Sequence, residues 1–190
     1  MNTSVDASLP TMYDWVKRTR EDVFAYTETL PNEIYLREHP DFPYGSMRDL
    51  QAHVAHAYVW WTGRYGLGLE PYRKHLEALP PGDVATPLAL RATLVALQDA
   101  ETLSLTNVAA MRKKFLEVDA ILEQAFETFD KLDEPLEVIR PGRDQLMVTQ
   151  RWLIVRPITH EFHHGGQLLM LGRALGHPLP EDMGTDLVLP

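Results

Sequence analysis

Four long stretches of the sequence carry apolar residues three and four positions apart, which is the spacing of a helix that buries one face. They cover residues 12–30, 47–65, 88–132 and 150–175. The spacing leaves open whether residues 88–103 and 107–132 form one interrupted helix or two. Amphipathic helices of this length in one small chain favour an all-α protein, an antiparallel four-helix bundle that forms a single domain over residues 1–190.

Capping residues indicate where several of these helices begin. Ser46 is a good N-cap for the helix over residues 47–65. Thr86 followed by Pro87 is typical of a cap and a first helical residue, and it opens the stretch over residues 88–103. Thr106 is the expected cap of the next helical stretch.

The last helical stretch, residues 150–175, contains a proline and is preceded by a different pattern. Pro157 removes one backbone donor, so we expect it to kink this helix or to shift its start. Gly176 is a natural residue to end it. Short apolar runs on both sides of Pro141-Gly142 predict a short hairpin or a structured loop over residues 133–149.

Charge and cysteine content limit the function classes. The chain has 18 Lys and Arg against 27 Asp and Glu, a formal net charge of −9, so it lacks the basic excess that nucleic acids or anionic lipids attract. No apolar run approaches the ~18 residues of a membrane span. The N-terminus has no signal-peptide pattern, so we expect a cytoplasmic protein. With 0 Cys, any metal must be held by His, Asp or Glu.

The most informative segment is HEFHHGGQ, residues 160–167. His160 and His164 are four residues apart, so both imidazoles project from one helix face, where they can share a metal ion. His53, on the expected second helix, is the best candidate for a third ligand. Three histidines on Zn²⁺, Ni²⁺ or Fe²⁺ leave positions for water or substrate, as in catalytic sites. The alternative is that the pair arises by chance or serves core packing.

The same segment also matches H-E-x-x-H, the zinc-peptidase signature in which Glu161 is the general base. The extended form of that signature fails, because Gln167 and Met170 occupy the positions of its later Gly and His. The acidic residues that remain as downstream ligands, Glu181 and Asp182, lie in a proline-rich tail. Peptidase chemistry is therefore the weaker interpretation.

Two segments carry a family resemblance. SMRDLQAHVAHAYVWW places one histidine on the second expected helix, and THEFHHGGQLLMLGRALGHP places an H-x-x-x-H pair before Gly-Gln and a leucine-rich end. This layout resembles the DinB/YfiT-like superfamily over nearly the full chain. The resemblance implies a four-helix bundle, a metal triad of His53, His160 and His164, binding of nickel, zinc or a similar ion, and a homodimer. Characterised branches include S-transferases that use bacillithiol or mycothiol, so it also implies a low-molecular-weight thiol cofactor.

Two features depart from that resemblance. The stretch over residues 88–103 looks like an extra helical segment. The ergothioneine-pathway branch carries H-x-x-x-H-x-E, whereas this chain has Gly166 at the acidic position. That branch is therefore disfavoured.

The leading hypothesis is a metal-dependent transferase or hydrolase in which the ion activates water or a thiol to attack a small-molecule substrate. Gln167, Glu161 and His56 are candidates for supporting roles; His163 is a further one, and Arg156 is placed to attract an anionic substrate. Trp60 and Trp61 either line the pocket or belong to the core. The alternatives are a non-enzymatic bundle with a structural or adventitious metal, and a dimerising stress protein without metal.

Overall fold

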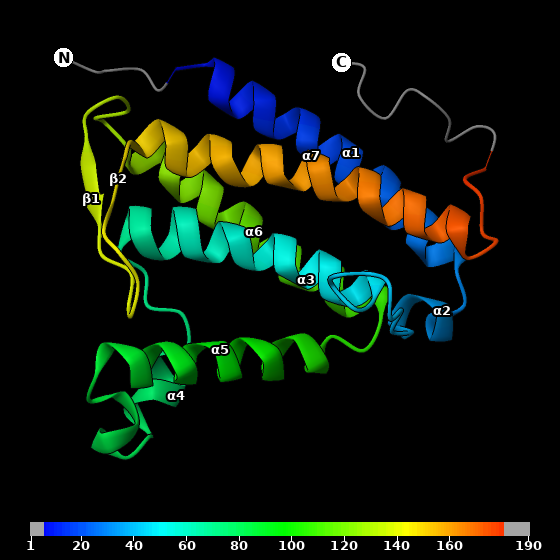
Figure 1. Cartoon of the computed structure of the whole chain (residues 1–190). Helices are drawn as coiled ribbons and strands as arrows, with labels where there is room; N and C mark the ends of the chain where they lie inside the picture. The colour runs from blue at the N-terminus through cyan, green and yellow to red at the C-terminus, as the bar shows by residue number, and fades with distance from the viewer. Residues whose placement is uncertain (1–5, 181–190) are drawn as a thin grey trace.

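The computed structural model describes residues 6–180 and is mostly helical, which confirms the all-α class (Figure 1). Its longer elements are α1 (Ser8–Thr29), α3 (Met47–Tyr58), the π-helix η1 (Val59–Gly66), α5 (Pro87–Ser104), α6 (Val108–Thr128) and α7 (Gln150–Ala174). The shorter ones are α2 (Asn32–Leu36), α4 (Arg73–Glu77), the 3₁₀ turn η2 (Pro81–Val84), β1 (Leu136–Val138) and β2 (Leu146–Val148). None of the helices in the described part of the chain is long and apolar enough to cross a membrane.

The four longest helical units pack side by side. The helix α1 contacts α6 and α7, and α3 with η1 also contacts α6 and α7 (Figure 1). The residues 88–132 form two separate helices, α5 and α6, which settles the question that the spacing left open. The extra helix α5 lies to one side of the other four and contacts α3.

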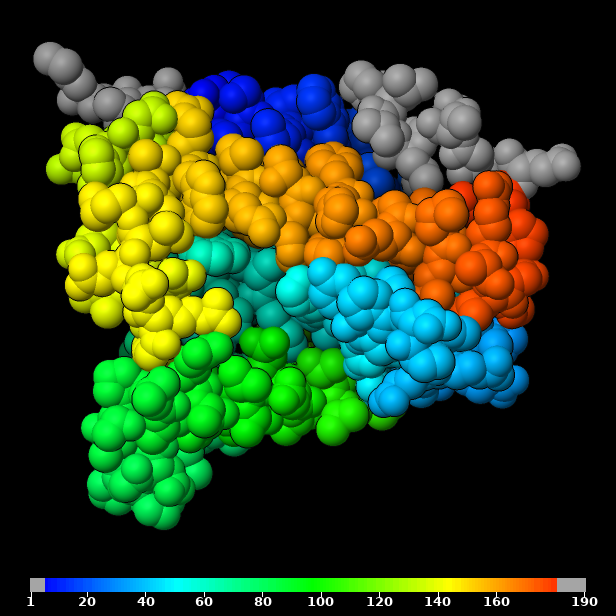
Figure 2. Space-filling view, in the orientation of Figure 1, coloured from blue at the N-terminus to red at the C-terminus, as the bar shows by residue number. Residues whose placement is uncertain are grey.

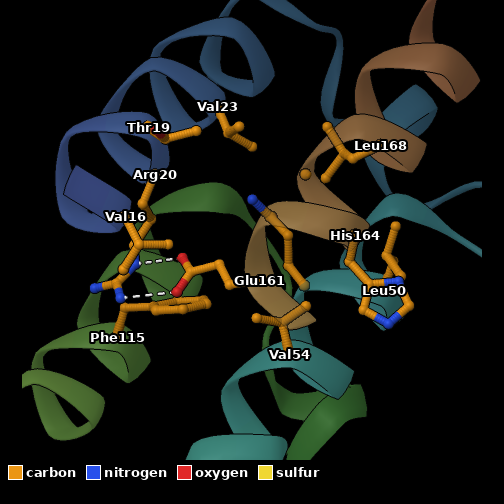
Figure 3. Close-up of a pocket in the computed structure, with 12 residues that line it drawn as sticks. Val16, Thr19, Arg20, Val23, Leu50, Val54, Phe115, Glu161, His164 and Leu168 are labelled. Atoms are coloured by element: carbon orange, nitrogen blue, oxygen red, sulfur yellow. Dashed lines mark hydrogen bonds and ion pairs between the residues drawn. The ribbon is translucent and has the colours of Figure 1, made fainter. Parts of the chain in front are cut away.

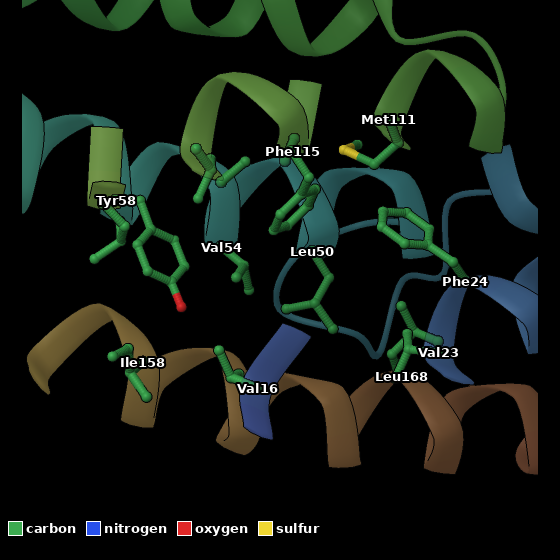
Figure 4. Close-up of a cluster of buried hydrophobic side chains, with 14 of the residues drawn as sticks. Val16, Val23, Phe24, Leu50, Val54, Tyr58, Met111, Phe115, Ile158 and Leu168 are labelled. Carbon is green, nitrogen blue, oxygen red and sulfur yellow. The ribbon is translucent and has the colours of Figure 1, made fainter. Parts of the chain in front are cut away.

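The core lies where these four units meet, and each contributes buried apolar side chains (Figure 4). Buried members include Val16, Phe24, Leu50, Val54, Met111, Phe115, Ile158 and Leu168. The ring of Phe24 on α1 meets that of Phe115 on α6 edge to face, with centroids 5.5 Å apart. Within this core α3 packs against α7, and these are the two helices that carry the histidines of interest.

Polar caps start the helices close to the expected positions. The Ser46 hydroxyl accepts from Asp49 N at 3.1 Å, and the Asp49 carboxylate accepts from Ser46 N, a complete capping box. Thr86 caps α5 as predicted. The prediction for α6 was wrong by one residue: Asn107, not Thr106, is the N-cap, because the Asn107 side-chain oxygen accepts from Ala110 N at 2.9 Å.

The helix α7 runs through Pro157 without interruption, because another side chain satisfies the carbonyl that the proline leaves free. Pro157 has no N–H for the carbonyl of Leu153, four residues earlier. The hydroxyl of Thr62 on η1 donates to that carbonyl at 2.8 Å, and Thr62 is fully buried. The expected shift of the helix start is absent, since α7 begins at Gln150 as the pattern predicted.

The segment before α7 is a two-stranded antiparallel hairpin in which Leu136 pairs with Val148 and Val138 with Leu146. Gly142 in its turn has φ +62°, and a Cβ there would lie 2.9 Å from Leu88 of α5. A glycine is therefore required both by the backbone conformation and by the close approach of the turn to α5. The hairpin turn and α5 meet at this point.

Two glycines of α7 are expected to respond to alanine in opposite directions. A Cβ on Gly172 would overlap the hydroxyl of Tyr26, which is buried and donates to His177 O at 2.5 Å. We expect Gly172→Ala to destabilise the fold by about 1–3 kcal/mol through overpacking. Gly166 has no atom within 4 Å of such a Cβ, so Gly166→Ala should stabilise the helix by up to about 1 kcal/mol. Chemical denaturation of both variants measures these effects, and equal shifts would contradict this assignment of the close contact.

Candidate metal centre

The packing of α3 against α7 brings three histidines together. His53 Nε2 lies 3.3 Å from His160 Nε2, and His160 Nε2 lies 2.9 Å from His164 Nε2. All three ligand atoms lie within 4.8 Å of one another. His160 and His164 come from one face of α7, and His53 comes from the facing side of α3. The three histidines that the sequence predicted as a metal triad therefore lie next to one another in the structure.

The spacing of these nitrogens fits a divalent transition metal. A tetrahedral ion with bonds of about 2.0–2.1 Å holds its ligand nitrogens about 3.3 Å apart, and the right-angled positions of a six-coordinate ion hold them about 2.9 Å apart. The His53–His160 and His160–His164 nitrogen pairs, at 3.3 and 2.9 Å, fall within this range. Three nitrogens and no carboxylate form a donor set that favours zinc, nickel or iron over magnesium or calcium.

Gln167 sets the proton position on one of the three rings. Its Oε1 lies 2.6 Å from His164 Nδ1. A carbonyl oxygen only accepts, so Nδ1 of His164 carries the proton and its Nε2 lone pair is left for an ion. Hydrogen bonds of this kind orient metal-bound histidines and fix their tautomer. Gln167 therefore contacts a triad histidine directly, one turn after it on α7.

Burial keeps the triad uncharged at neutral pH. Burial, followed by the neighbouring His164, lowers the pKa of His53 to about 4. The same causes, together with His53, lower the pKa of His160 to about 3. Burial also lowers the pKa of His164, against the opposing effect of its hydrogen bond to Gln167. Neutral imidazoles are the form that binds a metal, so protons do not compete for this cluster near pH 7.

Sequence reasoning missed an aromatic residue that packs on the triad. The ring of Tyr44 lies 4.9 Å, centroid to centroid, from both His53 and His164. Tyr44 comes from the loop before α3, two residues ahead of the Ser46 cap. The sequence feature that could have revealed Tyr44 is its position next to the N-cap of the helix that carries His53. A capping box fixes how the preceding loop enters the helix.

Glu161 is directed away from the triad, toward α1. Arg20 donates to its two carboxylate oxygens from Nε at 2.6 Å and Nη2 at 3.0 Å, and the Tyr58 hydroxyl donates at 2.6 Å. Figure 3 shows Glu161 pointing to Arg20 while the ring of His164 lies on the other side of α7. The cavity between them holds about 30 Å³, room for about one water molecule.

His56, one turn after His53, is buried beside α5. Its Nε2 lies 2.9 Å from the Glu101 carboxylate, which also accepts from Lys114 and Tyr72. Burial raises the pKa of Glu101, but these hydrogen bonds outweigh it and lower that pKa to about 2. The ionised carboxylate accepts the proton of His56 Nε2. The cluster also ties α5 to α3 and α6.

A pocket of about 330 Å³ opens beside the triad, and His53 and His160 form part of its wall. Figure 2 shows the surface hollowed between the hairpin turn (yellow), α5 (green) and the α3–η1 unit (cyan to teal). Trp60, Trp61 and Arg156 line it as well. Trp61 also packs on Trp152 with centroids 5.0 Å apart, so it is both a core contact and a pocket wall.

The remaining predicted residues are placed as follows. His163 is exposed on α7, with its ring edge-on to that of His164 at 4.9 Å between centroids. Glu181 and Asp182 lie outside the described residues.

A mostly helical chain with three converging histidines beside an open pocket defines a helical protein with a site that can hold a metal ion. The chain belongs to the DinB family, whose sequence model matches residues 1–188. A comparison with curated proteins finds no match.

Proposed function

We propose that this protein is a metal-dependent enzyme in which His53, His160 and His164 hold a divalent transition metal and the adjoining pocket takes a small-molecule substrate. The observation that carries the proposal is the convergence of three imidazole nitrogens at the wall of a 330 Å³ pocket. A structural ion is usually closed off by four protein ligands, whereas three ligands beside a pocket leave room for a reacting group. The four packed helical units support the antiparallel bundle that the family resemblance implies.

When bound, a divalent metal lowers the pKa of a coordinated water or thiol and makes it a nucleophile at neutral pH. The protein's own residues orient and surround that site. Gln167 holds the His164 ring in the ligating tautomer. The His56 imidazole, with its Nε2 proton held by Glu101, lines the same pocket and leaves Nδ1 without a partner among the described residues.

The reaction class that fits best is transfer of a thiol or water to a small electrophile, with a second copy of the chain as partner in a homodimer. The peptidase alternative is less well supported. Its general base would be Glu161, and that carboxylate is held by Arg20 and Tyr58 on the side of α7 away from the triad.

The test compares metal-stripped protein with protein reloaded with Zn²⁺, Ni²⁺ or Fe²⁺. A chromogenic aryl halide serves as the electrophile, with water, cysteine, glutathione, bacillithiol or mycothiol as the nucleophile. We expect a rate above background that requires one of the metals and is lost in His53→Ala. The absence of any metal-dependent rate, together with a large loss of thermal stability on chelation, would instead indicate a structural metal.

A further inference from the structure

We propose that the pocket beside the triad selects a small organic anion with a flat, apolar body, held at its negative group by arginine side chains. This inference deepens the proposed function, because it names the substrate class of the same site. It depends on the pocket alone and can be tested without the metal.

The charge of the pocket is opposite to that of the protein. Its wall contains four arginines that arrive from three elements: Arg91 from α5, Arg140 and Arg143 from the hairpin turn, and Arg156 from α7. None of the described residues that line it is acidic. In a chain with a formal net charge of −9, a pocket with four arginines and no acidic residue in its wall is unexpected from composition. Such a surface concentrates anions and directs them inward.

Protein carboxylates do not neutralise these guanidinium groups. Within residues 6–180, Arg91, Arg143 and Arg156 form no ion pair, and Arg140 donates only to the backbone carbonyl of Asp144, at 2.9 and 3.2 Å. The core arginine Arg20, by contrast, pairs with two carboxylates. Arginine is suited to hold a carboxylate or phosphate through paired N–H donors.

The remaining wall is flat and apolar. The π-helix η1 contributes Trp60, Trp61 and Tyr65, and α5 contributes Leu94 and Val95. The indole of Trp60 is fixed by a hydrogen bond to Gln98 at 2.8 Å. Fixed aromatic side chains bind a planar ligand at a small cost in conformational entropy. The volume of about 330 Å³ lies at the lower end of small-molecule sites, which are about 300–1,000 Å³.

The positions of the arginines along the pocket determine how a bound ligand is oriented. Arg156 is one turn before His160 on α7, so it lies on the triad side of the pocket. The hairpin turn that carries Arg140 and Arg143 packs against the start of α5, near Arg91. A ligand whose negative group contacts these three arginines extends its apolar body past the aromatic wall toward His53 and His160.

The experiment measures binding of 2-naphthoate and of the neutral, equally sized 2-naphthamide to the metal-stripped protein by isothermal titration calorimetry. Removing the metal prevents the carboxylate from binding the ion. We expect naphthoate to bind about tenfold more tightly or better, as loss of a charge-assisted hydrogen bond implies. Its affinity should also fall as the salt concentration rises. Equal affinities for the two ligands would overturn the proposal.

Matched variants locate the effect. Arg91→Gln/Arg143→Gln should weaken naphthoate binding about tenfold or more and leave naphthamide unchanged, and Arg91→Lys/Arg143→Lys should recover part of the loss. Arg37→Gln/Arg173→Gln changes the net charge equally at exposed positions outside the pocket, so it should leave binding unchanged. An equal loss in this control would show a non-specific charge effect and contradict the site.

Different results would overturn the proposed metal-dependent function and the proposed anionic substrate class. Metal content of the arginine variants should equal that of the unaltered protein, because none of these arginines belongs to the triad. Normal metal binding without anion selectivity would overturn only the substrate class. Anion selectivity without metal binding would overturn only the metal-dependent function.

Discussion

His160→Ala/His164→Ala is expected to abolish metal binding while the protein remains folded. The unaltered protein, purified without added chelator, should carry about one divalent transition metal per chain by elemental analysis, and the double variant almost none. Both rings face the cluster and are half-buried or buried. At a metal concentration about 100 times Kd, binding stabilises the folded state by about 2.7 kcal/mol. Chelation should therefore lower the Tm of the unaltered protein by about 5–10 °C and leave that of the double variant unchanged.

The matched control is His163→Ala on the same helix. His163 is exposed and lies outside the triad, so this variant should keep its metal and its response to chelator. Equal metal content in the unaltered protein and the double variant would contradict the metal centre. Metal loss in His163→Ala would show that the assignment of ligands on α7 is wrong.

Glu161→Ala is expected to be the most destabilising single substitution near the site. Arg20 is only 5% exposed, and the variant would leave its charge with Asp119 as the remaining carboxylate partner, while Tyr58 would lose its acceptor. Breaking a buried pair from one side typically costs about 3–5 kcal/mol. Thermal unfolding should record this as a fall in Tm of roughly 6–20 °C for a chain of this size.

Arg112→Ala provides the control on the outer surface. It removes exposed ion pairs between α6 and α1, with Glu21 and Glu28, and should cost no more than about 1 kcal/mol. The double variant Arg20→Met/Glu161→Leu should recover much of the stability, because it removes both buried charges. A Glu161 variant that kept its stability but lost peptide hydrolysis would favour the zinc-peptidase interpretation instead.

Local sequence signals predicted much of the fold. Helical periodicity located the long helices, and the Ser46 and Thr86 caps defined two starts, because these effects depend on neighbours within one turn. Gly176, with φ +84°, ends α7 as expected. The start of α1 at Ser8 was missed, because Pro10 falls in its first turn, where a missing N–H costs nothing.

The effect of Pro157 could not be predicted from its own helix. A proline in a helix is tolerated when another group satisfies the free carbonyl, and that group here is Thr62, 91 positions from Leu153 in the sequence. Such a partner becomes visible only after α7 and η1 have packed together. The π-helical form of η1 was equally hidden, since residues 47–65 follow one continuous helical pattern.

The residues of the candidate site also fall into two groups, those that local spacing predicted and those that only tertiary contacts bring together. The spacing of His160 and His164 placed them on one face from local geometry, whereas His53 depended on the family resemblance. The pocket arginines were missed apart from Arg156, because Arg91 and the hairpin turn are brought together only by tertiary contacts. The role of Glu161 was hidden for the same reason, as its partner Arg20 lies 141 positions away.

The separate position of α5 has an evolutionary consequence. The triad comes from α3 and α7, while α5 and the hairpin turn supply much of the opposite wall of the pocket. Mutations in residues 87–104 can therefore change which molecule is accepted without altering the metal ligands. Divergence of this helix among chains that keep the three histidines therefore offers a simple route to new specificities.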